Sequence, residues 1–366
     1  MKRAHNFSAG PAVLPLSVLQ ELQQALPSFQ ETQQGLMELS HRSKTFTDVV
    51  DKAKDRLSRL LSIPEDYEIL FLQGGASLQF YMSTLNLLAP NERADFIMTG
   101  TWSVKALKEA KRCSLSEAIW QPKDGIFNRC PKRKEIKPSE DSIYVHYTSN
   151  NTIFGTQFAE TPLVNKRLVV DVSSDICSRF IDISKHDVVY AGAQKNLGPS
   201  GVTVIILSPW AVEKSREVDS IRQGGIPSML NYGLMVDKES LFNTPNTFGI
   251  YALERMLNWL EDQGGVDEIA KINNRKASLI YNTIDGTDFW TPHAKKDSRS
   301  QMNITWRAPT VELENKFLQE ADENGLKALK GHRSVGGVRA SIYNACGVES
   351  VLALVDFMDD FAQKNG

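Results

Sequence analysis

The chain has 366 residues, and its 42 lysines and arginines are nearly balanced by 44 aspartates and glutamates, which gives a formal net charge of −2 at pH 7. This length predicts two domains that bury enough surface to fold without disulfides or structural metals. Because there is no net positive charge, we expect neither nucleic acid nor an anionic membrane surface as a partner. Any arginine cluster is therefore expected to serve a local purpose, such as binding a small anion.

The four cysteines are widely spread and include no C-x-x-C pair. This spacing favours neither a zinc site nor a disulfide framework, and it fits a reducing compartment. The opening residues, MKRAHNFSAGPAVLP, lack the apolar stretch of a signal peptide. No run approaches the ~18 apolar residues of a membrane span. We therefore expect a soluble, cytoplasmic protein with no metal centre.

Short apolar runs rich in β-branched and aromatic residues alternate with helical patterns along most of the chain. Runs that are apolar on both faces are typical of strands in a parallel sheet covered by helices. The predicted strands are 68–73, 94–99, 142–148, 167–173, 187–193 and 202–207. Helical patterns cover 77–88, 103–112, 246–262 and 266–284, and the tail adds strand-like segments at 301–307 and 338–344 and amphipathic helices near 310–323 and 348–362.

This order of elements predicts an α/β fold with a mostly parallel central sheet flanked by helices, followed by a smaller C-terminal α+β domain. We place an N-terminal segment at residues 1–15, packed with the small domain. The large domain is predicted at 16–255 and the small domain at 256–366.

The segment DVVYAGAQKNLGPSG carries the most informative signal for function. A predicted buried strand leads into Lys195, and its neighbours are small on both sides: Gly192, Ala193, Gly198 and Gly201. Small neighbours allow a planar ligand to approach a lysine closely. Desolvation would lower the pKa of that lysine and leave an amine able to form an imine with an aldehyde. Taken alone, the segment also fits a lysine that ends a strand before an ordinary turn.

Asp171 ends the apolar run RLVVD, one strand and one connection before Lys195. A carboxylate at a buried strand end is costly unless a positive group faces it. A pyridinium nitrogen is such a partner, and the pairing keeps a cofactor ring an electron sink. A helix cap is the alternative role for this aspartate. Together, the lysine and the aspartate favour a ring cofactor at the carboxyl ends of the strands, where open α/β sheets bind ligands.

Three further features fit such a site. The loop 73–77, QGGAS, places glycines before a predicted helix, where exposed N–H groups can meet a phosphate. It lacks the signatures of a P-loop and of a dinucleotide fold, so nucleotide binding is only a weak alternative. Trp102 follows a predicted strand and could stack on a ring, or belong to the core. Thr152 follows another strand and could bond a ring hydroxyl, or lie in an ordinary polar loop.

Six long segments, in the same order along the chain, are similar to those of the phosphoserine aminotransferases, in the class V branch of fold-type-I pyridoxal-phosphate enzymes. The segments are NFSAGPAVLP, HRSKTF, LQGGASLQF, YAGAQKNLGPSG, FNTPNTF and GHRSVGGVRASIYNA. They run from residue 6 to beyond residue 345 and so cover nearly the whole chain.

The resemblance implies a role for each matching residue. Lys195 matches the imine lysine and Asp171 the partner of the pyridine nitrogen. The remaining cofactor contacts are Trp102 for stacking, Thr152 near the ring hydroxyl, Ala76, Ser77 and Gln194 at the phosphate, and Asn243 and Thr244 at the phosphate of the neighbouring subunit. The implied substrate-anion residues are His41, Arg42, His332, Arg333 and Arg339.

Two positions distinguish this chain from other members and relatives. Some members have an arginine where this chain has Ser77, so here the cofactor phosphate would rely on helix-terminal N–H groups and a hydroxyl. Cysteine desulfurases have a histidine directly before the lysine, whereas this chain has Gln194. That difference disfavours a desulfurase.

The arginines argue for the substrate independently of the resemblance. Arginine binds carboxylate and phosphate groups in a bidentate manner. Two His-Arg pairs and Arg339, in a chain of net charge −2, indicate a small polyanionic ligand. Solvated surface arginines explain any one of these residues, but explain two His-Arg pairs poorly.

The resemblance implies a homodimer with shared active sites that exchanges an amino group between L-glutamate and 3-phosphohydroxypyruvate. The products are 2-oxoglutarate and O-phospho-L-serine, formed by a ping-pong mechanism. In vitamin B6 synthesis, 4-phosphohydroxythreonine is a further candidate substrate. An NAD-dependent oxidoreductase and a non-catalytic phosphate-binding module are the alternatives from other functional classes.

Overall fold

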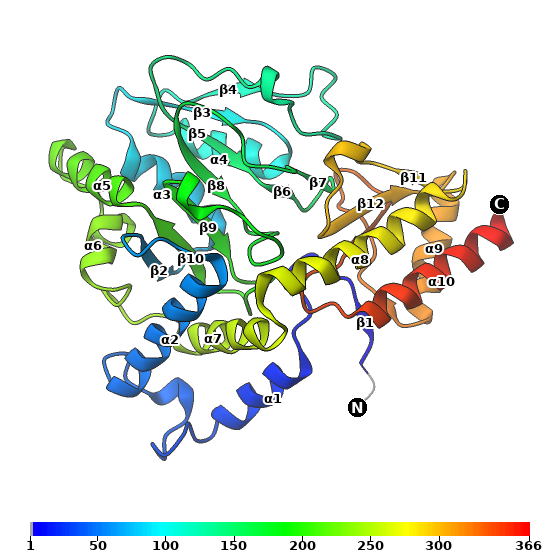
Figure 1. Ribbon diagram of the computed structural model, residues 1–366, viewed down its shortest axis with the longest axis horizontal. Coiled ribbons are helices and arrows are strands. Elements are labelled where there is room, and N and C mark those ends of the chain that lie inside the picture. The colour runs from blue at the N-terminus through cyan, green and yellow to red at the C-terminus, as the bar shows by residue number, and fades with distance from the viewer. Residues whose placement is uncertain (1–2) are drawn as a thin grey trace.

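The computed structural model describes residues 3–366, with a large α/β part and a smaller C-terminal part (Figure 1). Within these residues, the large part is built on a seven-stranded sheet. Its strands are β2 (Glu68–Leu72), β3 (Arg93–Ile97), β4 (Glu117–Trp120), β5 (Ser142–Thr148), β8 (Arg167–Asp171), β9 (Val188–Gly192) and β10 (Thr203–Leu207). They lie in the order β2-β10-β9-β8-β5-β3-β4. Only β10 runs antiparallel to its neighbours, so the sheet is mostly parallel as predicted.

Six of these strands coincide with the apolar runs of the sequence, and their ends differ from the predicted ends by one or two residues at most. The seventh, β4, was not predicted. It lies at the edge of the sheet, and the first half of its EAIW segment is exposed. A short, half-exposed edge strand has no continuous apolar run for sequence reasoning to detect.

Helices cover both faces of the sheet (Figure 1). They are α1 (Leu16–Ala25), α2 (Lys44–Leu61), α3 (Gly75–Leu87), α4 (Thr101–Ala110), α5 (Pro209–Ile221), α6 (Tyr232–Asp237) and α7 (Thr247–Asp262). Successive residues of one strand point to opposite faces. Val170 thus packs into the core under α2 and α7, whereas Val169 packs into the core under α3 and α4. Burial on both faces explains why the central strands are apolar throughout.

The chain enters the smaller part at the corner between α7 and α8 (Gly265–Asp285). Gly264 and Gly265 have φ values of +91° and +76° there, a left-handed conformation that glycine adopts without steric cost. The smaller part contains β11 (Thr291–Pro292), β12 (Asn303–Arg307), α9 (Val311–Glu323), β13 (Leu326–Lys327), β14 (Val338–Ser341) and α10 (Val348–Asn365). Near the N-terminus, β1 (His5–Asn6) pairs in parallel with β13, and Phe7 lies in the core of this part.

The division into domains remains a proposal. Residue 255, where we placed the boundary, lies inside α7, and α7 packs against α2 of the large part. The break between helices falls instead at Gly264 and Gly265, so a boundary there leaves every helix whole.

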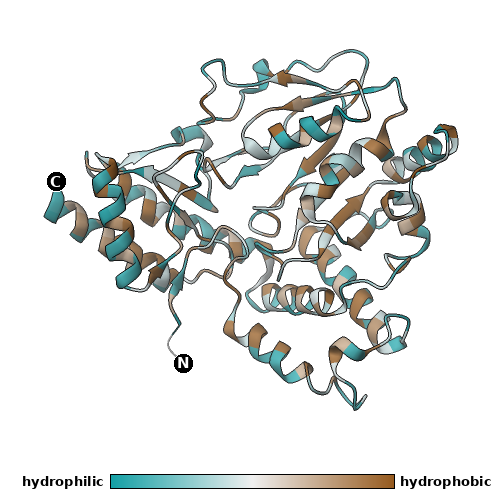
Figure 2. Cartoon of the chain, turned by 180° about the vertical axis from the view of Figure 1, so that it is seen from behind, coloured by the Kyte–Doolittle hydropathy of each residue, from teal (hydrophilic) through white to brown (hydrophobic). Residues whose placement is uncertain are grey.

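Figure 2 shows hydrophobic residues on the central strands and on the inward faces of the helices, with hydrophilic residues along the outer helical surfaces. No helix within residues 3–366 combines the length and the hydropathy needed to cross a bilayer.

Lys276 on α8 is buried and holds the segment that follows β14. Its Nζ donates hydrogen bonds to the carbonyl oxygens of Ile342 at 3.0 Å, Tyr343 at 2.9 Å and Cys346 at 3.0 Å. Burial lowers the pKa of Lys276 to about 8, so the amine is still mostly protonated at pH 7. One ammonium group therefore satisfies three carbonyls that water cannot reach.

We expect Lys276→Met to destabilise the protein by about 3 kcal/mol or more, because each buried carbonyl left without a donor costs about 1–3 kcal/mol. Thermal unfolding followed by circular dichroism measures this effect. The matched control is Lys271→Met on the same helix, where the lysine side chain is 71% exposed and pairs only with Glu268. Equal melting temperatures for the two variants would contradict the structural role of Lys276.

Candidate active site

Three predicted site residues meet at the carboxyl ends of adjacent parallel strands. Asp171 is the last residue of β8, Lys195 follows β9, and Thr152 lies shortly after β5. The Nζ of Lys195 donates a hydrogen bond to Oγ1 of Thr152 at 2.8 Å. Because parallel strands end at the same edge of a sheet, residues that are far apart in sequence converge here.

Opposing effects set the charge on Lys195. Burial lowers its pKa, the carboxylates of Asp171 and Asp175 raise it, and the charge of Arg339 lowers it, so that the net value is about 8. Asp171 is itself 4% exposed, and burial raises the pKa of its carboxyl group against the charge of Lys195 and a hydrogen bond from Ser173. A lysine with a pKa near 8 has a substantial neutral fraction at physiological pH, which a nucleophile requires.

Trp102 lies beside this lysine, in the first turn of α4. The centre of its ring is 6.0 Å from Nζ of Lys195. Its indole Nε1 is buried and has no hydrogen-bond partner among the described residues. The side chain therefore presents a flat apolar surface next to the reactive amine, as stacking on a ring requires.

The start of α3 forms a cradle suited to a phosphate. Gly74 and Gly75 have φ values of +92° and +65°, and no side chain caps the helix. The first N–H groups, which include those of Ala76 and Ser77, are thus free of a side-chain acceptor. A Cβ on Gly74 would lie 2.4 Å from Cδ2 of Leu78, so glycine is required for packing as well as for backbone conformation.

The glycines near Lys195 also make close contacts within the protein. A Cβ on Gly192 would lie 2.6 Å from Oε1 of Gln194, so this glycine makes room for the glutamine side chain. Gly198 faces the backbone of α7 at Leu253, and Gly201 faces Asn246. A Cβ on Gly201 would lie 2.6 Å from Nδ2 of Asn246, so this glycine serves packing, and ligand access at these positions stays a prediction.

Arg339 reaches the same site from the smaller part of the protein. It lies on β14, and its Nη1 donates to the carbonyl oxygen of Thr152 at 3.4 Å. Its Nε is buried without a partner in the described chain, and burial lowers the pKa of its guanidinium group. Thr152 therefore contacts Lys195 through its hydroxyl and Arg339 through its carbonyl.

His332 and Arg333 lie in the loop before β14 and join Arg339. Burial lowers the pKa of His332, and the positive charges of Arg339, Arg333 and Lys105 act in the same direction. His332 also bonds the hydroxyl of Ser334 at 2.7 Å through Nδ1. The structure thus brings three of the five predicted substrate-anion residues to one place.

The other two, His41 and Arg42, lie just before α2. Within residues 3–366, no hydrogen bond or ion pair links them to Lys195 or Arg339. Asn243 and Thr244 lie before α7, where Gln73 Nε2 donates to the carbonyl of Thr244 at 3.2 Å. The segment that contains Asn243 and Thr244 therefore contacts Gln73, which directly precedes Gly74 and Gly75 at the start of α3.

Sequence reasoning missed a set of buried asparagines that joins the two parts of the protein. The backbone N–H of Asn344 donates to Oδ1 of Asn196 at 3.0 Å, and its side-chain Nδ2 donates to the carbonyl of Cys177 at 2.9 Å. On α8, Asn273 donates to Oδ1 of Asn344 at 2.9 Å. Asn196 directly follows Lys195, so this link holds the lysine in register with the strand that carries Arg339. In the sequence, asparagines outside regular elements look like ordinary loop residues, and only their burial reveals the role.

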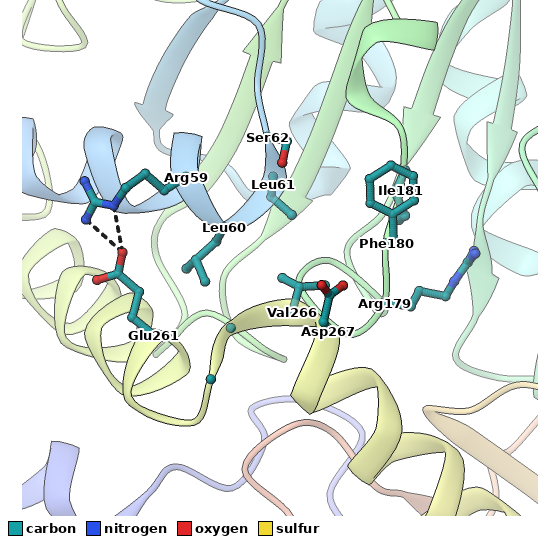
Figure 3. Close-up of a pocket in the computed structure, with 12 residues that line it drawn as sticks. Arg59, Leu60, Leu61, Ser62, Arg179, Phe180, Ile181, Glu261, Val266 and Asp267 are labelled. Atoms are coloured by element: carbon teal, nitrogen blue, oxygen red, sulfur yellow. Dashed lines mark hydrogen bonds and ion pairs between the residues drawn. The ribbon is translucent and has the colours of Figure 1, made fainter.

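A cavity of about 530 Å³ lies elsewhere, at the corner between α7 and α8 (Figure 3). Arg59 and Glu261 lie at its edge and already form an ion pair at 2.7 Å. Phe180 and Ile181 line another side. None of the predicted site residues lines this cavity, which is therefore separate from the chemistry at Lys195.

Comparison with known proteins identifies the class of this site. Residues 4–354 match the model of the family "Aminotransferase class-V". The chain belongs to the class-V aminotransferases and is a pyridoxal-phosphate-dependent aminotransferase.

The particular relatives are phosphoserine aminotransferases. The one from Geobacillus kaustophilus is 49% identical, over 100% of this chain and 99% of that protein. A solved phosphoserine aminotransferase from Bacillus circulans subsp. alkalophilus superposes with a TM-score of 0.94 and 44% identity, over 100% of both chains. The enzyme from Trichomonas vaginalis, whose structure has bound pyridoxal phosphate, gives a TM-score of 0.92 and 35% identity, over 98% of this chain and 100% of that one.

The residues present fit the cofactor that this family implies. A phosphate fits the uncapped start of α3, and a planar ring fits the face of Trp102. The buried carboxylate of Asp171 needs a positive partner, which a pyridinium nitrogen provides. The Nζ of Lys195 supplies the amine for the aldehyde.

We expect the cofactor-free protein to capture pyridoxal phosphate covalently at a rate that rises with pH, is half-maximal near pH 8 and levels off above about pH 9. Only the neutral amine attacks the aldehyde, and the pKa of Lys195 is lowered to about 8, so the neutral fraction grows as pH rises through that value. Stopped-flow absorbance gives the rate, and borohydride fixation with peptide mapping confirms the site. Lys195→Ala should show no capture, and a midpoint near the ordinary lysine pKa of 10.5 would contradict the expectation.

Proposed function

We propose that this protein is a phosphoserine aminotransferase. In this reaction, L-glutamate gives its amino group to 3-phosphohydroxypyruvate, and the products are 2-oxoglutarate and O-phospho-L-serine. The single observation that carries the proposal is the position of Arg339, which donates to the carbonyl oxygen of Thr152 while the Thr152 hydroxyl accepts from Lys195, with His332 and Arg333 in the loop before the same strand. Relatives of that name, 47–50% identical over nearly the full length, support it.

Residues of this chain would hold the cofactor as follows. The phosphate would lie at the N–H groups of Ala76 and Ser77 and near Gln194, with Asn243 and Thr244 from the neighbouring subunit. The ring would lie between Trp102 and the carboxylate of Asp171, with Thr152 near its hydroxyl. Bound pyridoxal phosphate supplies an electron sink for the carbanion left when an α-proton is removed.

Lys195 performs the proton transfers. Its pKa of about 8 makes Nζ both a base and an acid near neutral pH. The amine removes the α-proton of glutamate in the first half-reaction. In the second half-reaction it returns a proton to the α-carbon of the new amino acid. The hydrogen bond to Thr152 at 2.8 Å keeps Nζ in place while its charge changes.

The arginines orient both substrates in the same site. Arg339 binds the α-carboxylate, which all substrates share. His332 and Arg333, with His41 and Arg42, bind the phosphate of 3-phosphohydroxypyruvate and the side-chain carboxylate of glutamate in turn. Serine biosynthesis in the cytoplasm, and 4-phosphohydroxythreonine as a second substrate in vitamin B6 synthesis, extend the proposal on the family resemblance alone.

We expect hydroxypyruvate and pyruvate to be at least about a thousandfold poorer substrates, in kcat/KM, than phosphohydroxypyruvate. Each charge-assisted hydrogen bond contributes about 1.5–3 kcal/mol, so the loss of two or three bonds to the phosphate gives a factor of this order. Arg333→Ala should reduce the ratio of kcat/KM for phosphohydroxypyruvate to that for hydroxypyruvate or pyruvate. Arg339→Ala should lower kcat/KM for all three substrates by a similar factor. Comparable wild-type rates with pyruvate would leave an aminotransferase with a different substrate.

We also propose a homodimer in which each active site uses His41 and Arg42 of the neighbouring subunit. Mixing two inactive variants tests this arrangement. In a hybrid of Lys195→Ala and Arg42→Ala subunits, one site combines an intact Lys195 with an intact Arg42 from across the interface. We expect such hybrids to recover up to about half of the wild-type activity per dimer.

The matched control mixes Lys195→Ala with Arg339→Ala. Arg339 contacts Thr152 of its own chain, so no site in that hybrid is complete and no recovery is expected. Sedimentation velocity confirms that dimers form in each mixture. Failure of the Arg42 hybrid to recover activity would place Arg42 in the site of its own subunit, or outside the site altogether.

A further inference from the structure

Lys105 is a cation beside Trp102 that takes no part in the proposed cofactor or substrate contacts. It lies on α4, one turn after Trp102, and its Nζ is 4.6 Å from the centre of the Trp102 ring. The Nζ of Lys195 is 6.0 Å from the centre of the same ring. Lys105 therefore lies beside the same ring that Lys195 approaches.

The charge of Lys105 also acts on the substrate-anion residues of the smaller part of the protein. Its charge is among those that lower the pKa of His332, together with the charges of Arg339 and Arg333. The large and the small parts thus contribute positive groups to a common space.

No carboxylate neutralises this group of charges. Across residues 3–366, many arginines and lysines pair with an aspartate or glutamate, as Arg129 pairs with Glu135 at 2.7 Å. Lys105, Arg333 and Arg339 form no such ion pair in the described chain. Like charges held close together repel one another, and a multiply charged anion relieves that repulsion when it binds. In a chain of net charge −2, an unpaired cluster of this kind is suited to an anionic ligand.

We propose that Lys105 is a further specificity-determining residue, whose ammonium group binds the substrate phosphate together with His332 and Arg333. The inference rests on the proposed function. A lysine suits this position because its compact charge on a flexible stem binds a phosphate as a point charge, without a fixed geometry. The exposed side chain can swing from the Trp102 ring toward the phosphate at little cost.

If Lys105 only packs over Trp102 and does not bind the phosphate, the effect of its loss on kcat/KM differs. If Lys105 only packs over Trp102, its loss disturbs the ring and affects every substrate equally. If it binds the phosphate, its loss affects only substrates that carry one. The ratio of kcat/KM for phosphohydroxypyruvate to that for hydroxypyruvate separates the two roles.

The test compares Lys105→Gln with wild type as holoenzymes. We expect kcat/KM for phosphohydroxypyruvate to fall about tenfold, and that for hydroxypyruvate to change less than about twofold. The inhibition constant of inorganic phosphate against the phosphorylated substrate should rise by a similar factor. Lys105→Arg, which keeps the charge, should restore most of the preference. The matched control, Lys111→Gln, removes the same charge from the end of the same helix and should resemble wild type.

Equal losses with both substrates, or a Lys105→Gln variant that matches Lys111→Gln, would overturn the inference. The wild-type ratio tests the proposed function separately. A wild type that prefers the phosphorylated substrate, combined with an unchanged ratio in Lys105→Gln, would remove only the role of Lys105. A wild type without that preference would remove the proposed function and this inference with it.

Discussion

The desolvated amine of Lys195 is the feature on which the rest of the structure depends. Burial favours the neutral amine, whereas Asp171 and Asp175 favour the charged form, and the balance gives a pKa of about 8. Asp175 is itself buried and is held by Gln157 at 3.1 Å and Arg179 at 3.3 Å. Buried carboxylates are stable only when nearby groups donate hydrogen bonds or positive charge to them, and strands that end at one edge of the sheet bring such groups together. The parallel order of β5, β8 and β9 meets that requirement.

The site also requires two parts of the protein to keep a fixed relation. Thr152 contacts Lys195 with its hydroxyl and Arg339 with its carbonyl, so one residue of the large part spaces the amine from the arginine. The hydrogen bond from Asn344 to Asn196 also fixes the distance between Lys195 and the strand of Arg339. Lys276 stabilises the segment that contains Asn344 through its hydrogen bond to the carbonyl of Tyr343. Geometry of this kind matters because the proton transfers act over hydrogen-bond distances.

Much of the fold could be predicted from the sequence because its central strands are buried on both faces. Burial on both faces leaves continuous apolar runs, so six strands were found. Helices α3, α4 and α7 of the large part were also expected, whereas α1, α2, α5 and α6 were not. The sequence patterns did not predict the edge strand β4, and they did not locate the domain boundary. An exposed strand has a mixed pattern, and the corner at Gly264 and Gly265 lacks the run of proline, glycine and serine that is typical of a linker.

By itself, the sequence determined the class of chemistry. Lys195, Asp171, Trp102 and Thr152 were all expected near strand ends, and the structure brings them together because parallel strands end at one edge. Only the tertiary structure decided which small residues serve packing, which asparagines link the two parts and that Lys105 lies over the Trp102 ring. The roles of the small residues and the asparagines depend on contacts between segments that are separated along the chain, such as Gly198 with Leu253 and Asn196 with Asn344. Local patterns record which side of an element is buried, but not which distant residue lies against it.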